Sequence, residues 1–193
     1  METKEKILYT MKKLAGRKGF SAITTDQLAA ASGTSKRTLY RYFRSKEEIV
    51  EKVLESVMAG VDQRVGEIVA GPASPPEKLK AIARTVAEGV RFMEPHIFDD
   101  LQRHYPHLWD KIDRFRASRI HRLEQIYVEG CRLGYFREVN SDILLAAFLS
   151  ALQAVVTPAF FVNRAVSLPQ TLDALQEIFL HGISSLHIPE KKK

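Results

Sequence analysis

Apolar side chains recur along this chain with the spacing of amphipathic helices. The pattern begins at Ile7, repeats every three or four residues, and stops before Gly19, where a helix is expected to end. It resumes in further segments, and none of them has a credible strand pattern. The nine predicted helices cover residues 7–18, 24–32, 35–43, 45–70, 77–94, 96–104, 108–133, 141–157 and 170–186. We therefore predict an all-α fold.

Capping residues and a proline-rich break divide these helices. Thr24–Gln27 and Ser45–Glu48 each have the pattern of a capping box, in which a hydroxyl and a Gln or Glu side chain satisfy free backbone N–H groups. The run Gly71–Pro76 is the clearest break in the chain. We predict an N-terminal three-helix domain over residues 1–46 and a helical bundle over residues 47–193.

The helices predicted at 24–32 and 35–43 have the spacing of a helix-turn-helix motif. Gly33 permits a left-handed turn between them. Leu28, Leu39 and Phe43 are expected to pack against the first helix. A plain helical hairpin with a glycine turn has the same spacing, so this pattern alone leaves DNA binding and a structural role equally open.

The outer face of the second short helix carries donors and aromatic rings but no acidic residue. Arg and Lys can bind guanine edges and Thr can contact a thymine methyl group, whereas side chains at helix starts suit phosphate oxygens. Lys36, Arg37 and Thr38 would then select sequence, and Thr25 and Lys46 would contact phosphates. The exposed positions are Lys36, Arg37, Thr38, Tyr40, Arg41 and Tyr42.

The excess positive charge of the chain lies in the same region. Residues 1–60 contain 12 basic and 7 acidic side chains, whereas residues 61–193 contain 17 and 16. This imbalance points weakly to a polyanionic partner. A solvated basic face would produce the same imbalance, and charge alone favours that simpler interpretation.

Residues 7–54 resemble the DNA-binding domain of the TetR family of transcriptional regulators. The resemblance lies in Gly19-Phe20, Thr24, Leu28-Ala29, Gly33-Thr34-Ser35, Thr38-Leu39-Tyr40, Tyr42-Phe43 and Lys46-Glu47, which occur in the family's order. It implies a dimer that places two recognition helices in successive major grooves. Arg37 and Tyr42 stand where many members have Gly and His.

The resemblance also implies roles for individual residues. Thr24 or Thr25, Tyr40 and Lys46 match positions that contact phosphates in the family, and Ser35 at the helix start joins the same surface. The positions of the recognition helix correspond to Lys36, Arg37, Thr38 and Tyr42, with Arg41 beside them. The expected partner is double-stranded operator DNA.

The second half resembles the family only in its layout of a long helix, a linker and a bundle with a ligand cavity and a dimer face. We expect a largely apolar small-molecule effector, bound by aromatic and polar side chains of this bundle. An aromatic residue at helical spacing is nevertheless more often core than pocket. The candidate ligand-binding residues are Glu88, Arg91, Phe92, Asp99, Arg103, Trp109, Phe115, Phe148 and Gln153. Asp99 and Arg103 can equally pair with each other, because they lie four residues apart.

The last two helices carry more apolar residues than one small core needs. The layout of the family favours a homodimer in which this face is doubled by a two-fold axis. Burial within one subunit is the alternative. The residues of the predicted face are Leu145, Phe148, Leu149, Leu152, Val156, Leu172, Leu175, Ile178, Phe179 and Ile183.

Other classes of protein are disfavoured. The sequence has no His-Glu-x-x-His, phosphate-binding glycine loop or Gly-x-Ser-x-Gly, so we expect no enzyme and no cofactor. His104 and His107 with Asp99 or Asp100 form only a weak metal candidate, and we expect no metal site. Cys131 is the single cysteine and is expected to be inert. One cysteine excludes a disulfide framework, which suits a reducing cytoplasm, so we expect a cytoplasmic protein. No apolar run reaches the roughly 18–20 residues that span a bilayer, so we expect no membrane partner.

The function predicted from the sequence is a ligand-responsive transcriptional repressor that a small molecule releases from its operator. The effector would enter the bundle within residues 77–165 and separate the two DNA-binding domains through the long helix 45–70. The alternative is a helical carrier of lipids or small molecules that does not bind DNA. A carrier has no need of the basic helix, which distinguishes the two hypotheses.

Overall fold

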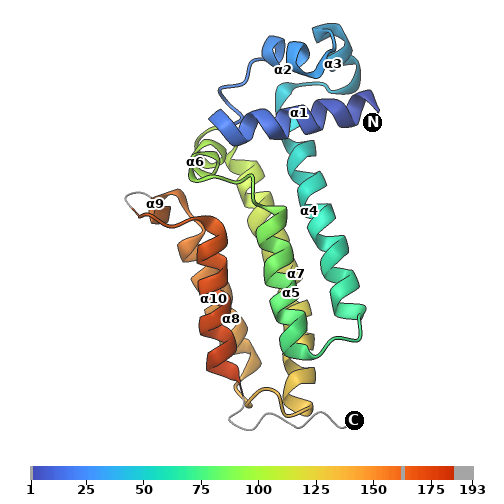
Figure 1. Cartoon of the computed structure of the whole chain (residues 1–193). Helices are drawn as coiled ribbons and strands as arrows, with labels where there is room; N and C mark the ends of the chain where they lie inside the picture. The colour runs from blue at the N-terminus through green and yellow to red at the C-terminus, as the bar shows by residue number, and fades with distance from the viewer. Residues whose placement is uncertain (1, 162–163, 185–193) are drawn as a thin grey trace.

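The computed structural model describes residues 2–161 and 164–184, and within this part of the chain the fold is all-α (Figure 1). An antiparallel bridge joins Phe136 and Ser184 without forming a strand. The helices are α1 (Thr3–Lys18), α2 (Thr25–Ser32), α3 (Lys36–Tyr42), α4 (Lys46–Ala70), α5 (Pro75–Gly89), α6 (Pro95–His104), α7 (Pro106–Arg132), α8 (Ser141–Val155), α9 (Pro158–Phe161) and α10 (Leu168–Ile183).

The described residues form ten helices, so the prediction of nine was one short. The missing element is α9, a single turn that starts at the predicted break because the Thr157 hydroxyl accepts a hydrogen bond from Phe160 N–H. The fifth helix ends at Gly89, not at Glu94, since glycine is a poor helix former and turn hydrogen bonds follow it. The last helix ends at Ile183; its predicted end, Leu186, lies outside the described residues.

The helices form an N-terminal head and a longitudinal bundle (Figure 1). The helices α1–α3 make the head, and α4 runs from it along the bundle beside α5 and α7. The α8 and α10 helices form a second pair, with α10 packed on α5 and α8 packed on α7. The short α6 helix lies under α1, where the head meets the bundle.

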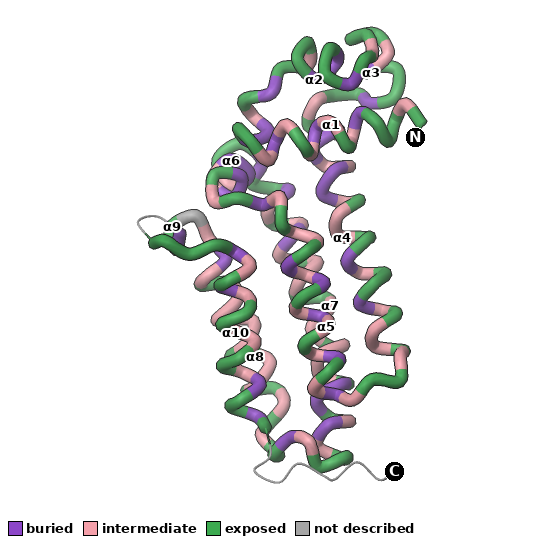
Figure 2. Tube along the Cα trace, in the orientation of Figure 1, coloured by how far each residue is buried: buried purple, intermediate pink, exposed green. Residues whose placement is uncertain are grey.

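One hydrophobic core crosses the junction between head and bundle (Figure 2). Ile7 and Met11 of α1 are buried in the same cluster as Leu54 of α4 and Leu101 of α6. The predicted domain boundary at residues 46–47 falls in the first turn of α4, and that helix continues unbroken from head to bundle. The head is therefore packed on the bundle rather than joined to it by a flexible linker.

A buried carboxylate of α6 ties the head to the bundle. Asp100 Oδ2 accepts hydrogen bonds from the backbone N–H groups of Phe20 at 2.6 Å and Ser21 at 3.1 Å, in the loop between α1 and α2. Gly19 has a φ of +81°, which favours glycine, and a Cβ there would lie 3.1 Å from Asp100 Cγ. The loop thus fits the carboxylate closely because residue 19 has no side chain.

We expect Asp100→Asn to lower the free energy of unfolding by about 1–3 kcal/mol, because it removes a charged acceptor from two backbone donors in a buried site. Urea denaturation followed by circular dichroism measures this change. The matched control is Asp99→Asn, since Asp99 pairs with Arg103 at the surface, where such pairs contribute about 0–1 kcal/mol. Equal losses of unfolding free energy in the two variants would show that the buried contact stabilises the protein no more than the surface pair does.

Candidate nucleic-acid interface and ligand cavity

The α2–α3 unit is a helix-turn-helix whose turn depends on Gly33. This glycine has a φ of +62° in the left-handed region and ends α2. Leu28, Leu39 and Phe43 are buried beneath the unit, as the apolar spacing predicted. The buried Ser32 hydroxyl donates to the Leu28 carbonyl oxygen at 2.7 Å, so no unpaired polar group is left under the turn.

Side-chain caps start all three helices of this region. The Thr24 hydroxyl accepts from Gln27 N–H at 3.2 Å and the Gln27 amide bonds back to Thr24 N–H, which confirms the first predicted capping box. The Ser35 hydroxyl accepts from Thr38 N–H. The Ser45–Glu48 prediction is only half right. The Ser45 hydroxyl accepts from Glu48 N–H, but the Glu48 carboxylate bonds to the preceding Arg44 N–H instead of returning to Ser45.

The outer face of α3 is cationic and exposed. Arg37 has no hydrogen bond or ion pair with any described residue, so its guanidinium donors are available. Lys36 forms an exposed ion pair with Asp26 at 3.2 Å, and Arg41 lies over the ring of Tyr42. Exposure extends over Lys36, Arg37, Tyr40, Arg41 and Tyr42, with Thr38 partly exposed. This face presents several donors in one short helix.

Lys46, a predicted phosphate contact, lies at the start of α4 and is partly buried. Its Nζ donates to the carbonyl oxygen of Ser21 at 2.7 Å, and burial lowers the pKa of its ammonium group. The same loop residue donates its N–H to Asp100. Lys46 and Asp100 therefore hold opposite sides of the Ser21 backbone, which gives Lys46 a structural contact in the free protein.

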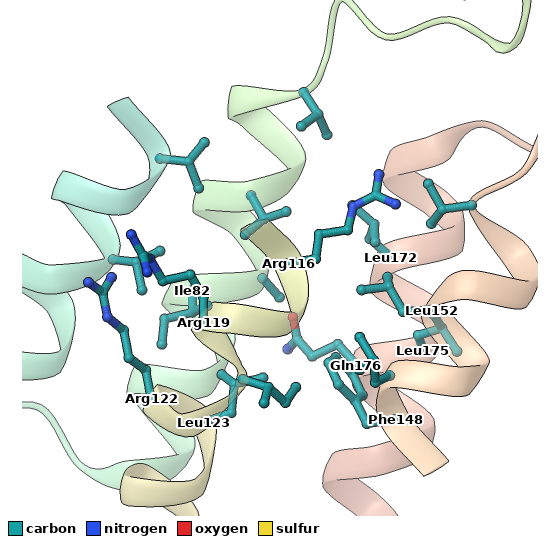
Figure 3. A pocket seen from close by; sticks show the side chains of 18 of the residues that line it. Ile82, Arg116, Arg119, Arg122, Leu123, Phe148, Leu152, Leu172, Leu175 and Gln176 are labelled. Atoms are coloured by element: carbon teal, nitrogen blue, oxygen red, sulfur yellow. The ribbon is translucent and has the colours of Figure 1, made fainter. Parts of the chain in front are cut away.

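A cavity of about 300 Å³ lies between the α4, α5 and α7 helices and the α8–α10 pair (Figure 3). Its walls are almost entirely aliphatic and aromatic, and they include Phe98 of α6. The charged or amide side chains of the lining are Asp62, Arg116, Arg119, Arg122 and Gln176. A concave apolar site with a few polar groups is typical of a small-molecule pocket.

The structure places three of the nine predicted ligand-binding residues, Phe92, Phe115 and Phe148, in the wall of this cavity. The other six do not line it. Glu88 lies 3.6 Å from Arg64 in an exposed ion pair, and Trp109 packs edge-on against Phe98. The remaining four are Arg91 and Gln153, which are exposed, and Asp99 and Arg103, which pair at 2.8 Å.

Most residues of the predicted dimer face point into the molecule. Nine of the ten line the cavity, so the apolar excess of the last two helices largely faces the interior of one subunit, where most of these side chains are only partly buried. Ile178 is the exception and is 66% exposed. The nine residues that were predicted in the dimer face and that line the cavity are Leu145, Phe148, Leu149, Leu152, Val156, Leu172, Leu175, Phe179 and Ile183.

Sequence reasoning missed the polar residues of the cavity. Arg116, Arg119 and Arg122 recur every three residues along α7, a spacing that places them on neighbouring parts of one helix surface. This spacing was the available signal, but basic residues on a long helix normally face solvent. Gln176 gave no signal, because an isolated glutamine in an amphipathic helix is common.

Asp62 of α4 binds two of these arginines. Its Oδ1 accepts from Arg119 Nε and from Arg122 at 2.7 Å each, and its Oδ2 accepts a second bond from Arg119. The hydrogen bond from Arg119 contributes most to lowering the pKa of Asp62, and the charges of both arginines act in the same direction against partial burial. The cluster links α4 to α7 across one side of the cavity.

We expect the stabilising effect of this cluster to depend on pH. The folded-state pKa of Asp62 is lowered, so its contribution is complete above the ordinary carboxylate pKa of about 3.9 and is lost as the pH falls through the lower folded value. Asp62→Asn should cost about 1–3 kcal/mol near neutral pH. Urea denaturation of parent and variant between neutral and strongly acidic pH measures the difference. A cost that stayed constant with pH would contradict the assigned ion pairs.

Three of the four residues of the weak metal candidate, His107, Asp100 and Asp99, have other contacts. His107 Nε2 lies 2.8 Å from Glu47 Oε1, Asp100 binds the loop of the head, and Asp99 binds Arg103. Among residues 2–161 and 164–184, no group of three His, Cys, Asp or Glu side chains is placed to hold a metal ion. No helix in that part of the chain is long and apolar enough to cross a membrane.

Comparison with known proteins adds a family match to this geometry. Residues 7–53, which contain the helix-turn-helix, match the family model described as bacterial regulatory proteins, tetR family. The chain is 26% identical over 182 residues to the uncharacterized HTH-type transcriptional regulator YvaF of Bacillus subtilis, covering 94% of this chain and 95% of that protein.

Two further proteins share part of the sequence or the fold. The HTH-type transcriptional repressor KstR2 of Mycobacterium tuberculosis is 26% identical over 136 residues, 66% of each chain. The crystal structure of the TetR family transcriptional regulator PfmR from Thermus thermophilus has a TM-score of 0.66 and 24% identity, covering 94% of this chain and 99% of that one. The similarity to PfmR supports the same fold over the 94% of this chain that it covers, which includes most of the bundle.

Proposed function

The chain belongs to the TetR family of transcriptional regulators, and from this premise we propose that it is a repressor released from operator DNA by a small molecule. The observation that carries the proposal is the exposed cationic face of α3, in which Arg37 has no partner among the described residues. The carrier alternative is not favoured, because a carrier would not use this face.

We assign the contacts with DNA as the sequence predicted them. Lys36, Arg37, Thr38 and Tyr42 would face base edges in the major groove, where Arg and Lys can donate to guanine. The phosphate contacts would come from Thr24 or Thr25, Tyr40 and Lys46, with Ser35 on the same surface and Arg41 beside the recognition positions. Such a protein works where the operator lies, so we place it in the cytoplasm, and we propose no catalytic activity for it.

Titration of the protein against its own upstream intergenic DNA at two salt concentrations tests the function. A specific regulator should bind one segment about 10³-fold or more above random DNA, with strong salt dependence. Arg37→Ala should cost about 1–3 kcal/mol and relax the preference at one position, because it removes a base contact. Lys46→Ala should weaken binding to all sequences and reduce the salt slope by about one.

Lys80→Ala is the control for these variants, since Lys80 is an exposed cation on α5, outside the proposed surface. Because Lys46 also contacts the Ser21 carbonyl, its variant must first be shown to unfold at the same urea concentration as the parent. The proposal fails if Arg37→Ala and Lys46→Ala both bind every DNA segment as tightly as the Lys80 variant.

The cavity is the proposed effector site, and its walls offer a route to the DNA-binding head. Leu54 and Met58 of α4 line it, and α4 begins directly after the helix-turn-helix. Phe98 of α6 lines it two residues before Asp100, which binds the Phe20–Ser21 backbone. A ligand that moved either helix would move the head. The ligand releases the protein from DNA only if it has a higher affinity for the arrangement that cannot bind DNA than for the arrangement that can.

We further propose a homodimer through α8 and α10. No residue of α8 is buried in the single chain, and Ile143 of α8 and Ile178 of α10 are each 66% exposed. The exposed positions of α8 also include Ala146, Ala147 and Ala154, whose small side chains allow close helix contact. A two-fold axis would double this face into a four-helix contact, in which the inward residues remain in the cavity.

Ile178→Glu should convert the dimer to a monomer, because it would place two carboxylates in an apolar contact around the two-fold axis. Sedimentation velocity at several protein concentrations measures the change in mass. The matched control is Val128→Glu, at a position 55% exposed on α7, a helix outside the proposed α8–α10 contact. A parent protein that sedimented as a monomer, or an Ile178 variant that stayed dimeric, would exclude this interface.

A further inference from the structure

The cavity contains one arginine whose hydrogen-bonding capacity the protein leaves largely unused. We propose that Arg116 binds the anionic head of an amphiphile, a carboxylate whose apolar body fills the remainder of the cavity. This inference rests on the proposed function only in taking the cavity as the effector site. It specifies the chemical class of the effector.

Arg116 is held inside the protein with few partners. Its side chain is 20% exposed, and its Nη1 donates to Asp113 Oδ1 at 2.9 Å. The guanidinium also lies 5.4 Å from the centre of the Trp109 ring. A guanidinium has five N–H donors, and within residues 2–161 and 164–184 Arg116 uses one of them in a hydrogen bond. Burial lowers the pKa of this group, as expected when a cation has lost much of its water.

The neighbouring arginines of the lining are different. Arg119 makes two hydrogen bonds to the Asp62 carboxylate, and Arg122 donates to both its side chain and its backbone carbonyl. Arg119 and Arg122 therefore already have a structural partner, because their ion pairs with Asp62 join α7 to α4. Arg116 makes the fewest hydrogen bonds of the three arginines, so it retains the most donors for an added molecule.

The side chain of Arg116 forms part of the cavity wall, and its guanidinium contacts Asp113 and Trp109, which lie outside the lining. In Figure 3, Arg116 extends from α7 toward α10, and Gln176 extends from α10 toward α7. The Gln176 amide has no hydrogen bond to any described residue. Each of these two walls thus contributes a polar side chain to a lining that is mainly aliphatic and aromatic.

The charge of the lining favours an anion. Arg116, Arg119 and Arg122 are opposed among the lining residues by Asp62 alone. Asp113 adds one negative charge beside Arg116, which still leaves the site positive. A carboxylate can accept two parallel hydrogen bonds from a guanidinium, and such pairs are stronger in a site with little water. A quaternary ammonium head would instead meet a net positive lining.

The remaining space suits an apolar body. The cavity of about 300 Å³ is roughly twice the engineered cavity of about 150 Å³ that holds benzene. Phe148 and Phe179 meet edge to face at 5.0 Å in its wall, and no further unpaired charge faces them. A ligand with a single anionic end therefore matches the distribution of polarity in the site.

Trp109 provides a direct test that does not involve DNA. It is the single tryptophan of the chain and lies against Arg116, so its fluorescence reports binding at this group. We would titrate the full-length protein with decanoate, dodecanoate and tetradecanoate, and with the matched alcohols and trimethylammonium salts, each below its micelle concentration. At least one carboxylate should bind about 10-fold or more tightly than its alcohol, and the ammonium salt should bind most weakly.

Arg116→Met should reduce the preference for carboxylate over alcohol to about one, because methionine keeps the apolar stem and removes the donors. Arg114→Met is the matched control, since Arg114 is an exposed arginine of the same helix. The double variant Asp113→Asn, Arg116→Met removes the carboxylate that the single variant leaves unpaired. The preference measured in the parent protein keeps the inference testable if these variants do not fold.

Three results would overturn the inference. They are equal affinity for carboxylates and alcohols, no binding by any of the carboxylates, and an unchanged preference in a folded Arg116→Met variant. Repeating the titration with operator DNA present separates this inference from the proposed function. Release by an uncharged ligand would support the regulator and exclude the anionic head. Selective binding of carboxylates without release from DNA would support the site for an anionic ligand group at Arg116 and would exclude the proposed effector response.

Discussion

The position of the DNA-binding head depends on one buried carboxylate. Asp100 accepts hydrogen bonds from two backbone N–H groups of the α1–α2 loop, and each side satisfies a group that would be costly to bury alone. Hydrogen bonds have narrow ranges of distance and angle, whereas apolar contacts tolerate sliding. The shared hydrophobic core therefore holds head and bundle together, and the carboxylate determines how one is oriented on the other.

This junction is connected to the wall of the cavity through α6. Phe98 lines the cavity and stacks on Phe161 at 5.8 Å, and Asp100 lies two residues further along the same ten-residue helix. Lys46, at the start of α4, holds the Ser21 carbonyl from the other side. Thus α4 and α6, which both contribute residues to the cavity wall, also contact the α1–α2 loop, through Lys46 and Asp100. A movement of α6 relative to α4 would change both contacts together.

Local sequence signals were sufficient for the head. The capping box at Thr24–Gln27, the left-handed Gly33 and the buried Leu28, Leu39 and Phe43 all lie where their spacing predicted. Each of these features depends on interactions within a few residues or on one helix face. Ser45–Glu48 shows the limit of such reasoning. The Glu48 carboxylate accepts from Arg44 N–H instead of Ser45 N–H, and the local sequence pattern does not distinguish these two donors.

The bundle required tertiary structure. The sequence established an all-α chain, the order of the long helices, the cationic surface of α3 and the family resemblance, because each follows from periodicity or from motifs within one segment. It did not decide which side of α8 and α10 faces the cavity, since these helices are apolar around much of their circumference and the pattern has no single direction. The packing of whole helices determines which side faces the cavity. It also places Asp100 beside a loop 80 residues away in the sequence and Arg116 in the cavity wall. Contacts between distant segments depend on the relative positions of whole helices, which no local pattern contains.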